Sequence, residues 1–132
     1  MDLSLSGSVN THFAEAVARH CEHSYDRASN SGFFWAQLTS VDSDIAVDFG
    51  IQFQPGQYKG SDTYRPGQIF NGGFASRPRI VVAGVEYAAT ASSTGTLTVA
   101  ADEVSGTIDI QKLTVQDQPS RQLAVKGSWR CA

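Results

Sequence analysis

Hydrophobic and polar residues alternate along most of the chain, which is the period-two pattern of β-strands that bury one face. The clearest run is 45–53, where Ile45, Val47, Phe49, Ile51 and Phe53 alternate with small or polar residues. The same period predicts further strands at 3–9, 33–40, 79–87, 96–100, 107–115 and 123–131. We therefore expect an all-β, mainly antiparallel fold, as a β-sandwich or a partly closed barrel.

Two local features refine this pattern. Asp42, Ser43 and Asp44 predict a hairpin turn between the strands at 33–40 and 45–53, because Asp and Ser side chains hydrogen-bond to nearby backbone. Within 107–115 the apolar parity shifts between Ile110 and Leu113. A one-residue shift of this kind predicts a β-bulge.

Residues 11–22 have a different period. Their apolar or aromatic positions recur at helical spacing, on one stripe made of Phe13, Ala16, Val17, His20 and Cys21. This spacing predicts one short helix packed on the sheet.

The chain has two cysteines, Cys21 and Cys131, and an even pair in a small β domain favours a disulfide. Cys131 shares the parity of Leu123, Val125 and Trp129 in the last predicted strand. Cys21 lies on the apolar stripe of the predicted helix. Both side chains are thus expected to face one interior, as a bridge requires. Two unrelated buried thiols are the alternative.

Composition limits the class of protein. A chain of 132 residues fits a single β domain, 1–132. Its net charge is −3 and its ten basic residues are scattered, which argues against nucleic acid as a partner. No apolar run reaches the 18 residues or so that a membrane span needs. Met1 is followed directly by a strand pattern, so the protein is either cytosolic or has lost a leader; the cysteine pair favours an extracytoplasmic protein whose leader was removed.

The long irregular stretch 54–78 is the first candidate for binding. Tyr58, Tyr64, Arg65 and Phe70 combine aromatic area with hydrogen-bonding groups, as binding surfaces do. The alternative is structural: Phe70 and Phe74 would close one end of the fold while the tyrosines cover its edge.

No pattern predicts catalytic residues, a metal or a cofactor. His20, Cys21 and His23 invite a zinc hypothesis, but their spacing matches no known zinc motif, and a disulfide would remove the thiolate. Asp48 and Glu86 lie on polar strand faces, where they are most simply solubilising. The chain contains neither a nucleophile elbow nor a dinucleotide-binding glycine motif.

Five short segments together resemble the small β domains of bacterial envelope lipoproteins and of secreted proteins of unknown function. They are 5–9, 55–58, 95–99, 105–107 and 127–131. The resemblance implies an extracytoplasmic β-sandwich and no particular activity. The lipobox leader of such lipoproteins is lacking here, so a lipid anchor would belong to the native precursor.

Three functions follow as hypotheses. The first is a non-enzymatic, extracytoplasmic binding or structural domain whose partner is a protein, a glycan or a small molecule. The second is a small, lipocalin-like barrel that encloses an apolar small molecule in a pocket lined by Phe33, Trp35, Phe49 and Trp129. The third is an enzyme that uses such a pocket.

Overall fold

A computed structural model describes residues 1–16, 18–26, 28–29, 31–42, 45–53, 57–66, 69–70, 73–74 and 76–131 of the chain. The described residues form thirteen β-strands: β1 (Asp2–Gly7), β2 (Thr11–Phe13), β3 (Ala18–Asp26), β4 (Ser31–Asp42), β5 (Ile45–Gln52), β6 (Asp62–Tyr64), β7 (Ile69–Phe70), β8 (Gly73–Phe74), β9 (Arg79–Val82), β10 (Val85–Ala88), β11 (Thr94–Val99), β12 (Ser105–Val115) and β13 (Gln118–Arg130). The pairings between them are antiparallel. The predicted all-β, antiparallel class is confirmed.

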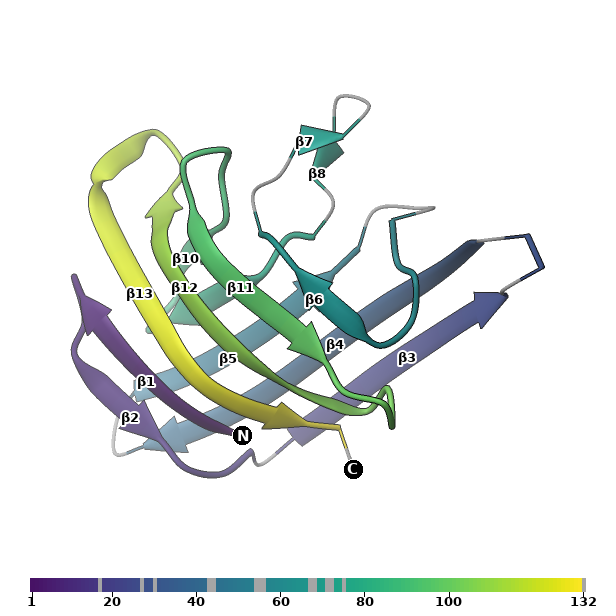
Figure 1. Cartoon of the computed structure of the whole chain (residues 1–132). Helices are drawn as coiled ribbons and strands as arrows, with labels where there is room; N and C mark the ends of the chain where they lie inside the picture. Colours follow the sequence, from purple (N-terminus) through teal and green to yellow (C-terminus); the bar gives the residue numbers. More distant parts are fainter. Residues whose placement is uncertain are drawn as a thin grey trace.

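Eleven of these strands form one curled sheet, a half-barrel, and β7 and β8 form a separate small hairpin (Figure 1). The main path of the sheet is β2-β1-β13-β12-β10-β9-β5-β4-β3, and β11 and β6 branch from β12. The two edge strands, β2 and β3, are consecutive in sequence, with only residues 14–17 between them. Five Cα–Cα steps reach at most about 18 Å. The sheet therefore curls until its two edges lie near each other.

Most predicted strands are present, and so are the hairpin 33–53 and the bulge. β4 and β5 pair in register down to Asp42 and Ile45, although Ser43 and Asp44 of the predicted turn lie outside the described residues. The register between β12 and β13 shifts between Ile110 and Leu113, where the intervening Lys112 has a φ of 63°.

The strand predicted at 79–87 is instead a hairpin of two short strands, β9 and β10. Its two-residue turn, Ala83 and Gly84, has φ values of 48° and 81°. Positive φ at both central residues is the geometry that joins antiparallel strands without splaying them. The turn explains why the apolar parity changes from Ile80 and Val82 to Tyr87.

The helix predicted over 11–22 is wrong. The segment contains β2 and β3, and no helix occurs among the described residues. Phe13 lies opposite Leu3 of β1, and Cys21 lies opposite Ala36 of β4. Pairing of β2 and β3 with the strands next to them in sequence, β1 and β4, outweighs the local helical spacing. Val17, part of the predicted stripe, is outside the described residues.

One hydrophobic core fills the inside of the curl. Each long strand contributes alternate residues to it, and the largest fully buried side chains are Trp129, Tyr58, Tyr87, Phe13, Phe34, Phe49, Leu3, Leu38, Ile51, Ile80, Leu97 and Ile108. Trp129 needs a glycine opposite it in β12. A Cβ atom on Gly106 would lie 2.7 Å from Cζ2 of the indole, so only glycine leaves room for the ring.

The predicted bridge between Cys21 and Cys131 is present, with the two Cα atoms 5.8 Å apart. It joins edge strand β3 to the residue that follows β13, two parts of the sheet that no backbone pairing connects directly. A disulfide is consistent with an oxidising, extracytoplasmic compartment. Within the described residues there is no helix long and apolar enough to cross a membrane.

We expect the bridge to carry a large part of the stability. It closes a loop with a sequence separation of 110 residues, for which loss of chain entropy corresponds to about 4–5 kcal/mol. The variant C21S/C131S should therefore lose about that free energy of unfolding and melt about 10–20 °C lower. Urea denaturation of the oxidised protein, the reduced protein and the variant tests this. Two titratable thiols in unreduced, unfolded protein would contradict the bridge.

Candidate functional site

The tyrosines of the segment 54–78 lie inside the protein. Tyr58 is 0% exposed and Tyr64 is 9% exposed. Their rings pack with Phe34, Phe53 and Trp129, a set that we call the aromatic cluster; neighbouring ring centroids within it are 4.5–6.3 Å apart. The cluster brings together side chains from β4 on one side of the curl and from β6 and β13 on the other side. We call these two sides the walls of the curl and the opening between them its mouth.

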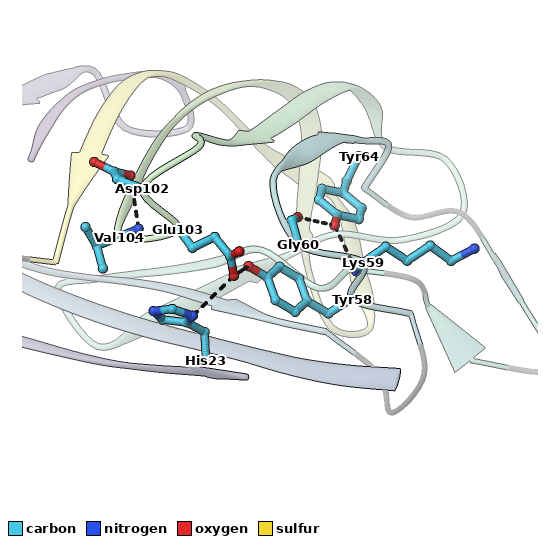
Figure 2. Close-up of polar contacts among 8 residues, drawn as sticks. All are labelled: His23, Tyr58, Lys59, Gly60, Tyr64, Asp102, Glu103 and Val104. Atoms are coloured by element: carbon cyan, nitrogen blue, oxygen red, sulfur yellow. Dashed lines mark hydrogen bonds and ion pairs between the residues drawn. The ribbon is translucent and has the colours of Figure 1, made fainter. Parts of the chain in front are cut away.

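Hydrogen bonds fix both phenols at this mouth (Figure 2). The Tyr58 hydroxyl donates to Oε2 of Glu103 at 2.7 Å, and Nδ1 of His23 lies 3.3 Å from the same oxygen. The Tyr64 hydroxyl donates to the Gly60 carbonyl at 2.6 Å and accepts from the Lys59 amide at 3.0 Å. Residues 57–64 are therefore held as a lid over the aromatic cluster.

Burial raises the pKa of Tyr58, and the hydrogen bond to Glu103 raises it further. Burial also raises the pKa of Tyr64. Both phenols stay protonated at neutral pH and donate the hydrogen bonds that hold residues 57–64 in place.

The four loop residues predicted to bind a partner do not form one surface. Tyr58 and Tyr64 are in the core, as in the structural alternative, whereas Arg65 is exposed. Phe70 belongs to β7, but its side chain is outside the described residues, as is that of Phe74. Buried rings offer no area to a partner in this conformation.

The four residues predicted to line an interior pocket are divided between two faces. Phe49 and Trp129 are 0% and 2% exposed in the core. Phe33 is 48% exposed, and Trp35 is half-buried with the same strand parity. Strand β4 instead turns Phe34 inward, where its ring packs against Tyr58 of the aromatic cluster.

The sequence contains the signal that assigns these faces. On the parity of Phe34 come Ala36 and Leu38, whereas Gln37 follows Trp35 on the other parity. A strand that buries one face turns its consistently apolar parity inward. Trp35 is therefore expected on the outer face.

Trp35 lines a groove on that outer face, built from two adjoining pockets. The first has a volume of about 210 Å³, and the residues that line it include Trp35, Gly50, Gln52, Arg77, Arg79 and Glu86. The second has a volume of about 600 Å³, and its lining includes Arg77, Glu86, Ala88, Thr90, Gln118 and Arg121. Because they share Arg77, Glu86 and Ala88, we treat them as one outer groove.

Local backbone features create the outer groove. Gly50 lies opposite Arg79 of β9, and a Cβ atom there would lie 3.1 Å from Nε of Arg79, so glycine lets the Arg79 side chain lie close over the backbone of β5. Strands β10 and β12 pair only at Ala88 and Thr114, and they diverge beyond this pair. This divergence opens the larger pocket.

The side chains of the outer groove combine positive charge with a flat ring. Arg77, Arg79 and Arg121 belong to the lining, and among its described residues the one carboxylate is that of Glu86, whose Oε2 lies 3.1 Å from Nη1 of Arg79. His20 packs against Trp35 with ring centroids 4.7 Å apart. The groove thus provides stacking area, hydrogen-bonding amides and cations.

Two carboxylates on the neighbouring strands are already paired within the protein. Oε1 of Glu22 lies 3.1 Å from Nε2 of His20. Oδ2 of Asp48 accepts from Nε2 of Gln37 at 2.8 Å, whereas Oδ1 of the same carboxylate is buried without a hydrogen-bond partner among the described residues.

The histidine and cysteine side chains do not assemble into a metal site. Alternation along β3 places His20 and His23 on opposite faces of the sheet, and Cys21 between them is in the disulfide. Among the described residues no three His, Cys, Asp or Glu side chains come together as a metal ion would require.

Comparison with protein-family models, with curated proteins and with solved structures found no match to this chain.

The buried tyrosines predict a stability effect. Replacing Tyr58 by Ala removes a fully buried ring and leaves Glu103 without its donor, so the free energy of unfolding should fall by about 3–5 kcal/mol. Arg65→Ala, in the same segment but exposed, should change it by about 0.5 kcal/mol or less. Urea denaturation measures both. Equal, small effects of the two changes would show that the Tyr58 ring is dispensable to the core.

The raised pKa values predict an alkaline loss of stability. Above about pH 10 the unfolded chain releases the Tyr58 proton while the folded chain keeps it, so the folded state weakens by about 1.4 kcal/mol per pH unit for this tyrosine. Tyr58→Phe should make the slope of unfolding free energy against pH shallower by that amount. The check is a series of urea denaturations between neutral pH and pH 11 or so. An unchanged slope in Tyr58→Phe would contradict the assignment.

Proposed function

We propose that this chain is a non-enzymatic, extracytoplasmic domain that binds a glycan through the outer groove. The observation that carries the proposal is the position of Trp35, whose ring lies on the outer face of the sheet, in a groove that also contains Gln52 and Arg79. The apolar C–H face of a sugar ring packs on an indole, and its hydroxyl groups bond to amide, carboxylate and guanidinium groups beside the ring. Aromatic and Arg side chains are also the types enriched in binding surfaces.

The groups in the outer groove suit binding better than catalysis. General acid–base or covalent chemistry requires a paired acid and base, or an activated nucleophile. The lining carboxylate, Glu86, forms an ion pair with Arg79. Uncharged polar side chains of the lining, among them Gln52, Thr90 and Gln118, supply hydrogen bonds.

We also propose that the curled sheet acts as a partly closed barrel with a filled interior. In support, the short connection 14–17 keeps the edge strands β2 and β3 close, and the disulfide ties β3 to the end of β13. The aromatic cluster occupies the mouth. The native precursor would then be secreted or held at the envelope by a lipid anchor. The disulfide supports that compartment.

The test is retention of the protein by soluble polysaccharides in native affinity electrophoresis. The panel contains neutral and charged polymers, and the proteins compared are wild type, Trp35→Ala and Arg65→Ala. Wild type and Arg65→Ala should be retained by a member of the panel, and Trp35→Ala should bind it at least about tenfold more weakly. Trp35→Ala should keep a melting temperature within a few degrees of wild type, because its ring is only half-buried. Retention of Trp35→Ala together with loss of retention in Arg65→Ala would instead place the binding site in the segment 54–78.

A further inference from the structure

We propose that the glycan bound in the outer groove is acidic: a chain of sugars whose carboxylates pair with Arg77, Arg79 and Arg121 while one ring stacks on Trp35. This inference rests on the proposed glycan-binding function and adds the charge and the length of the ligand.

The charge of the outer groove is opposite to that of the chain. The whole protein has a net charge of −3, yet the described residues of the lining include three arginines and one carboxylate. A cleft that concentrates one sign of charge attracts ligands of the other sign. Arginine in particular presents a planar fork of donors that matches a carboxylate.

The outer groove is also long. It crosses the sheet from Trp35 on β4, over β5, β9, β10 and β12, to Arg121 on β13. Five steps of about 4.8 Å between neighbouring strands give a path of about 24 Å along the sheet. Cations spread over such a path suit an oligomer with repeated negative groups better than a single small anion.

The position of the outer groove on a sheet face disfavours an acidic peptide. A peptide strand binds most readily at a sheet edge, where unpaired backbone groups are available. Strand β5, on the floor of the groove, is paired on one side with β4 and on the other with β9. A ligand there is recognised by side chains alone, among them the indole of Trp35 and the guanidinium of Arg79.

The test is isothermal titration calorimetry with a short oligogalacturonate. Its matched neutral probe is the same oligomer with the carboxylates reduced to alcohols, and polyglutamate and inorganic phosphate are further probes. Wild type should bind the oligogalacturonate, more weakly as salt is raised. It should bind the reduced oligomer at least about tenfold more weakly.

Opposite substitutions in one ion pair give the sharpest test. Arg79→Gln should weaken oligogalacturonate binding about five- to tenfold, because it removes a cation that pairs with the sugar acid. Glu86→Gln should strengthen binding about two- to threefold, because it removes the carboxylate that competes for Arg79. If the pair only held the fold together, both changes would weaken binding. Arg65→Gln, which removes the same charge outside the groove, is the matched control.

The remaining outcomes separate this inference from the proposed function. Equal binding of the neutral and acidic oligomers, lost in Trp35→Ala, would overturn the acidic ligand and leave the glycan-binding function intact. Binding of polyglutamate but of neither oligomer, with dependence on Arg79, would overturn both in favour of an acidic protein partner. Binding of phosphate as tight as that of the oligogalacturonate would overturn the oligomeric ligand. No binding of either oligomer, together with no retention by the polysaccharide panel, would overturn both proposals.

Discussion

The fold depends on closing a curled sheet around an interior that its strands alone leave open. Backbone pairing ends at the edge strands β2 and β3, and the Cys21–Cys131 bond then ties β3 to the end of β13. With that link in place, Phe34 from one wall meets Trp129 from the other at a ring distance of 5.5 Å. Tyr58 can then pack between the walls and donate to Glu103. Each contact needs both walls, so the covalent link and the aromatic cluster support each other.

The inside of the curl holds the hydrophobic core and the aromatic cluster. Aromatic rings that contact each other at 4.5–6.3 Å leave the inside to the protein's own side chains. The inward parity of each strand is thus committed to packing, and the binding that we propose uses the outward parity. Outward positions of a β-strand are ordinarily polar, so the aromatic pair Phe33 and Trp35 on the outer face of β4 calls for a functional explanation.

The sequence predicts the features that depend on local periodicity and misses those that depend on distant partners. Alternation over 45–53 and 123–131 and the parity shift near Lys112 correctly give two strands and a bulge. Cys21 was predicted to face inward, but on a helix, because the helical spacing over 13–21 conceals the hairpin that β3 forms with the next strand, β4. Periodicity also fails for consecutive aromatics, because Phe33, Phe34 and Trp35 offer large rings to both faces. The burial of Tyr58 depends on a carboxylate 45 residues away, and no local pattern contains that contact.

The same branching of the sheet closes the interior and opens the outer groove. Along one side of β12, β11 pairs up to Gln111, and β10 takes over at Thr114. The bulge lies at this exchange, and the turn between β10 and β11 is fastened there by a hydrogen bond of 2.8 Å from the Ser93 hydroxyl to the Lys112 carbonyl. β11 replaces β10 beside β12 and pairs on its other side with β6. This pairing places β6 and its Tyr64 over the mouth. For the same reason β10 diverges from β12, and the space between them becomes the larger pocket of the groove. A change that straightened the bulge would therefore disturb the lid and the outer groove together.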